Sequence, residues 1–394
     1  MPLLFATLLI LAAPARADAP VQSPPAETDT SDAPPDERGL LRRYIDQLIK
    51  GPAQPEKPQF LIYPVLAYAP ETRLEMGLSS LYLFRARRDP TNRLSEIPVY
   101  VFYTFNNQFG VRFENAVFTN QSRWSFLGEG QIQYFPLKYY GIGTDAESDD
   151  AVVVDARLAL IRERVLVRLG ESDLYFGPEI GFNAIGNVEF QPLDGPVPDP
   201  LPRGGDGTAN LTVGLGLVHD TRHNPLNVRE GVFGEIAYLQ SSDRFLSEYT
   251  FGNAYVDLRG YLPIGEHNVL AGQVLGQFGN GDLPFNELAL IGGESIMRGY
   301  YTGRYRDQNL TAAQVEFRML PIPMSWTNRI GAAAFLAAGT VAPTISDLSL
   351  SEVRVTGGAG IRVLTFPKSD IFTRGDIGWS EDGPGFYIYV GEAF

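Results

Sequence analysis

Residues Glu352–Arg362 read EVRVTGGAGIR, and polar and apolar side chains alternate along this stretch. Apart from three glycines, the even positions carry Glu, Arg, Thr and Arg, and the odd positions carry Val, Val, Ala and Ile. A period of two is typical of a β-strand, because successive side chains point to opposite faces. The stretch therefore predicts a strand with one polar face and one apolar face.

The same alternation recurs from Leu61 to Phe394, for example in Arg123–Tyr134, Asn253–Leu258 and Ala313–Met319. Many of these segments are long enough to cross a bilayer as tilted strands, and their number is even, as in bacterial single-chain barrels. The sequence predicts an all-β fold, a 16-stranded antiparallel transmembrane β-barrel. The expected strands are 61–67, 73–85, 96–105, 109–118, 122–135, 151–168, 173–187, 208–220, 230–240, 247–261, 267–279, 309–319, 328–339, 352–364, 369–379 and 384–394.

The lengths of the connections support a barrel in an outer membrane. Long connections fall at 136–150, 188–207, 280–308 and 340–351, always after an odd-numbered strand. Most connections after even-numbered strands are short, which is the pattern of barrels with external loops and periplasmic turns. Within 151–168 the polar residues change face, so we expect either a β-bulge or a protruding strand there.

The composition excludes several classes of protein. The 394 residues carry a net charge of -14, which argues against a nucleic-acid partner because such partners need a basic surface. There is no cysteine, so disulfides and thiolate metal sites are excluded. A mean hydropathy of -0.08 fits a barrel with one wet face on every strand.

The N-terminal part divides into segments of different character. Residues 1–17 contain a short apolar run followed by Ala-Arg-Ala, which predicts a signal peptide. Residues 18–58 form a predicted disordered linker, rich in Pro and Asp, within which 36–50 has the spacing of an amphipathic helix. This helix is expected beside the barrel, in its lumen or at the lipid interface, and the barrel occupies 59–394.

Four segments resemble, in order, the surface-antigen barrels of outer membranes, the superfamily of the BamA and TamA assembly factors. Ile62–Thr72 is similar to the first strand of that family, and Gly385–Phe394 to its terminal strand with an aromatic insertion signal. His219–Asn227 resembles the family's periplasmic turn, and Gly292–Tyr300 resembles the sixth extracellular loop. The turn residues that match the family's motif are Asp220, Thr221, Arg222, Asn224 and Pro225. Residues 18–59 are too few for the POTRA modules of the family, so the resemblance implies a member without them.

The resemblance implies that loop six folds into the barrel and that its arginine docks on lumenal carboxylates. On this basis Arg298, Gly299 and Tyr300 form the loop-six lock. Glu316 matches the glutamate expected in the twelfth strand. The aspartate expected in the thirteenth strand is replaced by alanine in this sequence, and Asp376 on the fifteenth strand is the proposed substitute.

The first and last strands are expected to meet at a weak seam. Pro64 has no N–H group for a ladder hydrogen bond, and Tyr68 follows it in the first strand. Phe386 and Phe394 are the seam residues expected in the last strand. Such a seam resembles the lateral gate of the family, and an ordinary closure with a fraying edge is the alternative.

Taken with the resemblance, these features predict a protein of the bacterial outer membrane that assists insertion or translocation of proteins or lipids through the seam. The alternative is a structural barrel or narrow passive pore. Expected partners are outer-membrane lipid, lipopolysaccharide, client outer-membrane proteins and periplasmic proteins, with no nucleic acid. With three histidines and no nucleophile elbow around Ser295, we expect neither an enzyme nor a cofactor or metal site.

Overall fold

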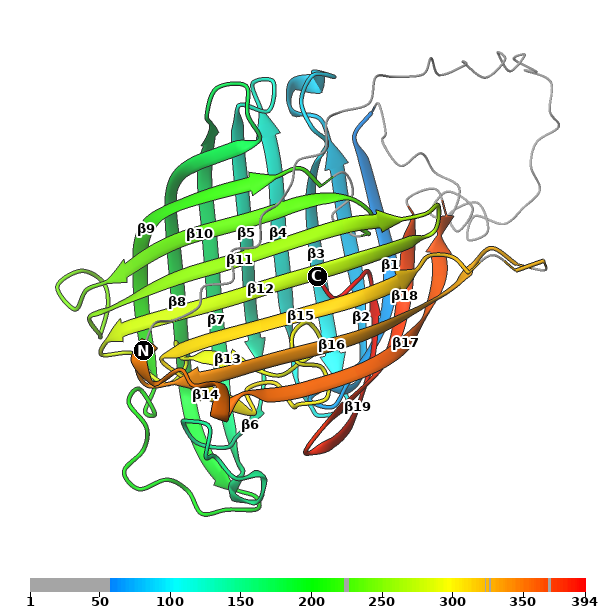
Figure 1. Cartoon of the computed structure of the whole chain (residues 1–394). Helices are drawn as coiled ribbons and strands as arrows, with labels where there is room; N and C mark the ends of the chain where they lie inside the picture. Colours follow the sequence, from blue (N-terminus) through cyan, green and yellow to red (C-terminus); the bar gives the residue numbers. More distant parts are fainter. Residues whose placement is uncertain (1–56, 223–226, 323, 326, 368–369) are drawn as a thin grey trace, which may run out of the picture. The chain divides into compact units, whose positions relative to one another are not determined.

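The computed structural model describes residues 57–222, 227–322, 324–325, 327–367 and 370–394, which form a closed β-barrel (Figure 1). Among these residues, sixteen long antiparallel strands follow one another around the wall in chain order, and the last pairs with the first. The strands of the wall are β1 (Gln59–Ala69), β2 (Arg73–Phe84), β3 (Ser95–Thr104), β4 (Phe109–Thr119), β5 (Trp124–Tyr134), β7 (Val152–Arg168), β8 (Leu174–Pro192), β9 (Thr208–Asp220), β10 (Gly231–Ser241), β11 (Phe251–Ile264), β12 (Asn268–Gly281), β15 (Asn309–Met319), β16 (Ile330–Ala342), β17 (Arg354–Phe366), β18 (Ile371–Ser380) and β19 (Gly383–Val390).

The 16-stranded barrel predicted from the alternation is therefore confirmed, and each expected strand overlaps one observed strand. Several boundaries were displaced: β8 continues to Pro192, β11 begins at Phe251, and the last strand ends at Val390 and does not continue to Phe394. The signal peptide predicted at 1–17 and the helix predicted at 36–50 lie outside the described residues, as does nearly all of the predicted linker.

Shorter elements lie in the connections between the long strands. Strand β6 (Leu137–Tyr139) pairs with β7, and β13 (Ala289–Ile291) pairs with β14 (Tyr305–Asp307) inside the connection 282–308. The helical elements of the described residues are single 3₁₀ turns, at Ala86–Arg88, Ser148–Asp150, Ile345–Asp347 and Leu350–Glu352. None of the described helices has the length and apolar character needed to cross a membrane.

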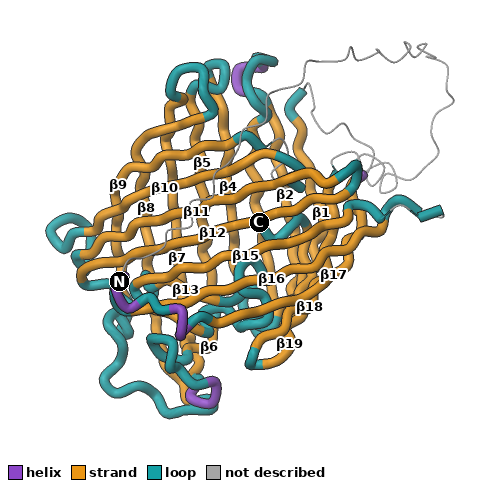
Figure 2. The backbone as a smooth tube through the Cα atoms, viewed as in Figure 1, coloured by secondary structure: helices purple, strands orange, loops and turns teal. Residues whose placement is uncertain are grey.

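The two faces of the wall, whose continuous strands are visible in Figure 2, differ in chemistry as the alternation predicts. In β15, Gln314, Glu316 and Arg318 are buried on the inner face, whereas Val315 between them is exposed on the outer face. In β16, Leu336 is 61% exposed. A barrel that turns apolar side chains outward and charges inward is built for an apolar surrounding.

A β-bulge lies beside the segment 151–168, but its extra residue belongs to β8. Between the pairs Asp155–Glu189 and Arg157–Gly186, β7 has one residue and β8 has two, and Asn187 has a φ of +53°. The expectation of a bulge within 151–168 was therefore wrong, because β7 itself pairs with β5 in unbroken register from Arg157 to Val167. Both strands continue past the bulge and are the longest of the barrel, with 17 and 19 residues. The register of β7 and β8 changes between Asp155 and Arg157, and both strands remain paired on either side of the bulge.

The long connection 282–308, here called loop six, folds back into the barrel. Its buried apolar side chains form a cluster with inward-facing residues of β15 and β16. The members of the cluster are Ala289, Ile291, Ile296, Met297, Tyr300, Tyr305, Leu310, Ala312, Ala337 and Val341. Apolar burial thus anchors the loop inside the lumen, where its polar groups meet the inner face of the wall.

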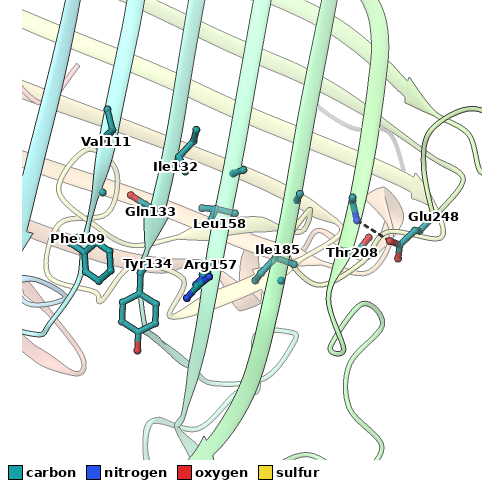
Figure 3. A pocket seen from close by; sticks show the side chains of 15 residues that line it. Phe109, Val111, Ile132, Gln133, Tyr134, Arg157, Leu158, Ile185, Thr208 and Glu248 are labelled. Carbon is teal, nitrogen blue, oxygen red and sulfur yellow. Dashed lines mark hydrogen bonds between the residues drawn. The ribbon is translucent and has the colours of Figure 1, made fainter.

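A groove of about 650 Å³ lies on the wall across β4, β5, β7, β8 and β9 (Figure 3). Its floor follows from the register, because Ala159, Ala184 and Ala209 are direct partners on three neighbouring strands. Their small side chains leave a depression beside the larger Val111 and Ile132, which are exposed on the outer face. The groove is therefore open to the surroundings of the barrel.

The outward orientation of Leu336 gives a direct test of the membrane-facing surface. Leu336→Arg places a charge near the middle of β16 and is expected to lower the free energy of unfolding by about 2–4 kcal/mol. Ile345→Arg, in the connection after β16, is the control, because Ile345 is also exposed (62%) but lies outside the strands. Denaturant unfolding in lipid vesicles measures both. Equal, small effects would contradict an apolar surrounding for the outer face.

Candidate functional site

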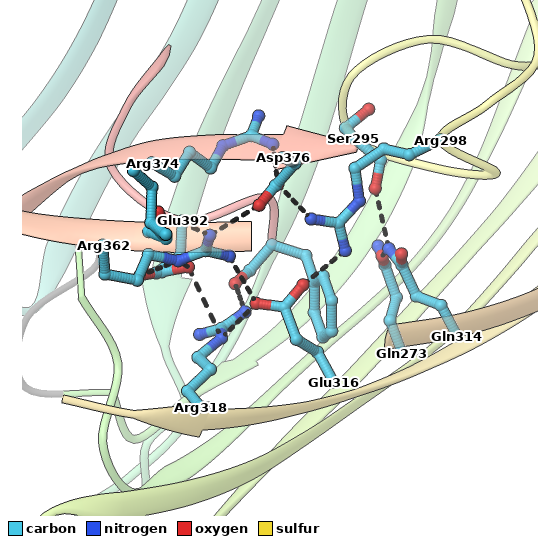
Figure 4. Close-up of polar contacts among 12 residues, drawn as sticks. Gln273, Ser295, Arg298, Gln314, Glu316, Arg318, Arg362, Arg374, Asp376 and Glu392 are labelled. Atoms are coloured by element: carbon cyan, nitrogen blue, oxygen red, sulfur yellow. Dashed lines mark hydrogen bonds and ion pairs between the residues drawn. The ribbon is translucent and has the colours of Figure 1, made fainter. Parts of the chain in front are cut away.

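The centre of the candidate site is Arg298, which loop six carries into the lumen, where it is 1% exposed (Figure 4). Its Nη1 donates to Oδ2 of Asp376 at 2.5 Å, and its Nη2 donates to Oε2 of Glu316. The guanidinium carbon also lies 3.5 Å from the ring centroid of Phe335 on β16. One arginine of a loop thus binds three strands of the barrel wall at once.

The two carboxylates that hold Arg298 also bind arginines of the wall. Glu316 accepts hydrogen bonds from Arg318 at 2.8 Å and from Arg362 at 3.1 Å. Asp376 accepts from Arg362 at 2.5 Å and from Arg374 at 3.0 Å. Such charge-assisted bonds are stronger than bonds between neutral groups, and the shared acceptors couple the loop to β15, β17 and β18.

Glu392, which follows β19, completes this lumenal network by accepting from Arg362 Nε at 2.9 Å. The network consists of Arg298, Glu316, Arg318, Arg362, Arg374, Asp376 and Glu392. It has four guanidinium groups and three carboxylates, so Arg298 brings the single excess positive charge. Removing Arg298 would leave the wall with equal numbers of opposite charges.

Gly299 is required by the close approach of the loop backbone to β18. Its φ is +118°, and a Cβ at this position would lie 2.9 Å from the carbonyl carbon of Trp379. A Cβ at Gly378 would in turn lie 2.4 Å from the oxygen of Arg298. Glycine at both positions therefore allows the loop and β18 to touch backbone to backbone.

Tyr300 follows the glycine and is also buried in the lumen. Its ring packs edge-on against Tyr305, with the centroids 5.5 Å apart. Its main-chain oxygen accepts a hydrogen bond from the hydroxyl of Tyr387 on β19 at 3.2 Å. The three loop residues identified from the sequence are thus brought together with Glu316 and Asp376 in one place.

The residues assigned to the seam are not all placed at it. Within the described residues, β1 and β19 have one register pair, Tyr68 with Ile388, whereas β1 and β2 pair over their full common length. Pro64 lies on β1 opposite Leu78 of β2 and is exposed. Phe386 is 50% exposed on the outer face of β19.

Phe394 lies elsewhere, inside the barrel. Its ring contacts Tyr261 of β11, with centroids 6.4 Å apart, and lies 5.0 Å from the guanidinium carbon of Arg318. Its main-chain oxygen accepts from Nη2 of Arg318 at 3.1 Å. The chain leaves the ladder after Val390 because these lumenal contacts bury both the aromatic ring and the neighbouring Glu392.

The turn after β9 contains the residues that resemble a family motif. Arg222 donates to Oδ1 of Asp220 at 2.9 Å and lies over the ring of Phe233, 4.2 Å from its centroid. The hydroxyl of Thr221 accepts from the backbone N–H of Val232 at 2.9 Å, which ties the turn to β10. Asn224 and Pro225 lie outside the described residues.

The sequence reading did not assign Arg362, Arg374 and Glu392 to the site. Arg362 and Arg374 do follow the polar alternation of their strands, as Asp376 does. What was missing was the register between strands far apart in the sequence, which decides which inward-facing charges meet. Arg374 lies two residues before Asp376 on the same face of β18, and Arg362 is the register partner of Arg374 on β17. A search for inward-facing arginines close to Asp376 on these two strands would have found both.

Two contacts outside the lumenal network also hold loop six. Glu71, in the turn between β1 and β2, accepts from the backbone N–H of Thr302 at 3.1 Å and from its hydroxyl. Burial raises the pKa of Glu71, while the hydrogen bonds from Thr302 oppose this change. Arg304 donates to Asp382 in the turn between β18 and β19 at 2.6 Å.

A closed sixteen-stranded barrel with a long loop anchored on lumenal carboxylates belongs to the class of transmembrane β-barrel proteins. The Omp85 superfamily domain matches residues 155–365, more than half of the sequence, and the chain is a member of this superfamily. The resemblance to the BamA and TamA superfamily is therefore confirmed, and homologous barrels of this superfamily reside in outer membranes.

Two solved structures share the fold. The crystal structure of BamA from Haemophilus ducreyi lacking POTRA domains 1–3 matches with a TM-score of 0.54 and 12% identity, covering 85% of this chain and 70% of that one. CdiB from Acinetobacter baumannii matches with a TM-score of 0.52 and 11% identity, covering 84% of this chain and 59% of that one. At these identities the likeness concerns the fold. No curated protein matches the sequence.

Arg298→Ala is expected to loosen loop six without unfolding the barrel, because Glu316 and Asp376 each keep hydrogen bonds from arginines of the wall. Losing one partner of a desolvated pair costs about 3–5 kcal/mol, and less where water enters. Protease cleavage within 282–308 should therefore accelerate in whole cells.

The matched control for Arg298→Ala is Arg203→Ala. Arg203 pairs with Asp282 of the same loop at 3.1 Å, but both side chains are exposed, at 47% and 65%. An exposed pair contributes about 0–1 kcal/mol. Unchanged cleavage in Arg298→Ala, or equal acceleration in both variants, would contradict a special role of the buried arginine.

The environment of Glu287, in the first part of loop six, predicts that the stability of the protein depends on pH. Its Oε1 is shielded from solvent and has no hydrogen-bond partner among the described residues. Burial raises the pKa of Glu287 to about 7, and Asn183 partly opposes the change. The pKa of Glu287 is higher in the folded protein than in the unfolded chain, so the folded state binds the proton more tightly. The free energy of unfolding is therefore highest, as far as Glu287 is concerned, below about pH 4.5, and it falls as pH rises through about 7.

Glu287→Gln removes this titration and is expected to stabilise the protein at pH 8 by roughly 1–3 kcal/mol relative to the parent, since one pKa unit corresponds to about 1.4 kcal/mol. Near pH 4.5 the two proteins should be equally stable. Thermal unfolding in detergent at both pH values measures the difference. A gap that is the same at pH 4.5 and pH 8 would contradict the raised pKa.

Proposed function

We propose that this protein is an outer-membrane barrel that assists the insertion or translocation of proteins or lipids through the seam between β1 and β19. The observation that supports the proposal most strongly is the short pairing at this seam, Tyr68 with Ile388. Other neighbouring long strands share several register pairs, from six between β3 and β4 upward. Among the described residues, the paired length is thus much shorter at this position than between the other neighbouring strands.

The register makes the two sides of the seam unequal. Because Tyr68 pairs antiparallel with Ile388, Leu66 comes opposite Val390, where β19 ends. The part of β1 from Gln59 to Val65 therefore lies beyond the end of β19. In the proposed open state, a strand edge in this part could template pairing with an incoming strand, as in β-strand addition.

Pro64 lies within this extended half of β1 and cannot donate a ladder hydrogen bond. A proline here weakens any permanent pairing of the edge without preventing a client strand from pairing on either side of it. The same edge is the place at which a lipid or a polypeptide could pass between bilayer and lumen.

The loop-six lock is the second part of the proposal. Arg298 is held by two carboxylates on opposite sides of the site, and Gly299 and Tyr300 contact β18 and β19. We infer that this arrangement keeps the loop in the lumen while the seam is closed. The desolvated ion pairs make the docked position well defined, because an alternative position would leave buried charges unpaired.

The proposal places the protein in the bacterial outer membrane, in contact with lipid and lipopolysaccharide, with client outer-membrane proteins and periplasmic proteins as partners. It requires no catalytic residue, cofactor or metal ion. In the alternative, a structural barrel or narrow passive pore, the seam stays closed. Single-channel conductance without any insertion activity would favour that alternative.

A disulfide across the seam tests the proposal. The chain has no cysteine, so Tyr68→Cys with Ile388→Cys gives one defined pair at the register position. In proteoliposomes that receive an unfolded client barrel, oxidation is expected to reduce insertion at least tenfold, and reductant should restore it.

The control pair is Tyr82→Cys with Ile97→Cys, which are register partners of β2 and β3 away from the seam. Oxidation of this pair should leave insertion unchanged. Full insertion activity with the seam crosslinked would overturn the proposed route. No insertion by the parent protein, with or without oxidation, would overturn the proposed function itself.

A further inference from the structure

Loop six lies across the seam on the lumenal side, and its residues 299–302 contact both edges. On one side, the backbone N–H of Gly299 donates to the hydroxyl of Tyr387 at 2.9 Å. The same hydroxyl donates to the main-chain oxygen of Tyr300, and Ser380 donates to the oxygen of Gly299 at 3.1 Å. These contacts belong to β18 and β19.

Contacts on the opposite side of the seam involve Thr302 and Glu71. The backbone N–H and the hydroxyl of Thr302 both donate to Oε1 of Glu71, in the turn 70–72 that joins β1 and β2. Glu71 is 5% exposed. Only Tyr301 separates the residue that binds β19 from the residue that binds this turn.

The turn that carries Glu71 is braced independently of the carboxylate. Its main-chain oxygen accepts from Nδ2 of Asn106 at 2.7 Å and from Nε2 of Gln108 at 3.1 Å. Both donors come from the connection between β3 and β4. A change in the Glu71 side chain therefore alters its contact with Thr302 while the turn keeps its backbone supports.

We propose that Glu71 and Thr302 form a clasp that closes the seam from inside, and that they are positioning residues for its opening. The consequence of the clasp, control over when a protein or lipid passes the seam, rests on the proposed function. The clasp itself rests only on the observed contacts. Among the described residues, β1 and β19 share the register pair Tyr68–Ile388, and the contacts of residues 299–302 add further hydrogen bonds across the seam.

The clasp is built to be reversible. Oε2 of Glu71 is buried and has no hydrogen-bond partner among the described residues. A buried acceptor without a donor is unfavourable, and it regains water when the turn moves away from the loop. The closed state is thus stabilised by two hydrogen bonds to Oε1 of Glu71 and destabilised by the burial of Oε2 without a donor.

The lock and the clasp act at different places on the same loop. Arg298 fixes the loop to β15 and β18, on the β19 side of the seam. Thr302 fixes the edge that contains β1 to that loop. With Arg298 docked, release of Glu71 frees β1 without requiring the loop to leave the lumen.

Hydrogen–deuterium exchange in lipid nanodiscs tests the clasp. In the full-length protein, Glu71→Leu and Thr302→Val are expected to raise exchange in peptides containing Tyr68 or Ile388 about threefold to tenfold, the effect of losing one or two hydrogen bonds. Peptides from β7 and β8 should keep their exchange rates. Client insertion is measured on the same samples.

Conservative variants distinguish the loss of hydrogen bonds from a change in side-chain size. Glu71→Gln keeps an acceptor oxygen and Thr302→Ser keeps the hydroxyl, so both should exchange nearly as the parent does. Glu352→Gln, at an acid in the connection after β16, is the control for loss of one surface charge. Heat-modifiable migration on gels confirms that every variant is folded.

Unchanged exchange at the seam in Glu71→Leu and Thr302→Val would overturn the clasp. Exchange raised equally in all strands would also overturn it, because the two residues would then stabilise the barrel as a whole. Faster exchange confined to the seam supports the clasp. If exchange is faster only at the seam while neither the parent nor the variants insert a client protein, the result supports the clasp and contradicts the proposed function.

Discussion

A charged group withdrawn from water must find its counter-charges inside the protein, and this constraint organises the lumen of the barrel. Arg298 is held between Glu316 and Asp376, and each of these acids also binds arginines of the wall. The position of loop six is therefore fixed by electrostatics as well as by its apolar cluster. Because the carboxylates are shared, moving the loop alters the pairing of β15, β17 and β18 together.

The fold was predictable from the sequence because one physical rule acts on every strand. Polar and apolar side chains alternate with a period of two, as in Glu352–Arg362, because one face of each strand meets water and the other meets an apolar surrounding. The bulge opposite Ala156 lies in β8, and the alternation of β7 does not locate it. Asp376 could be chosen as a partner of Arg298 because it falls on the polar face of its strand.

Other parts of the site depend on distances that alternation does not encode. Arg362 shares the polar pattern of its strand, but its partners Glu316 on β15 and Asp376 on β18 are set by the register around the barrel. Glu71 lies in a turn, where no periodicity marks it. Phe394 continues an apparent strand pattern, yet contacts with Tyr261 and Arg318 draw it into the lumen. These contacts link segments far apart in the chain.

The inward path of the residues after β19 makes the barrel mechanically asymmetric. Glu392 is bonded to Arg362, and Phe394 is packed against β11, so β19 is moored to the opposite wall. Strand β1 is joined to β2 along its length, to loop six through the turn at Glu71, and to Phe366 of β17 through the ring of Tyr63. If the seam opens as proposed, the lumenal contacts hold the end of β19 in place, so the β1–β2 hairpin is the side expected to move.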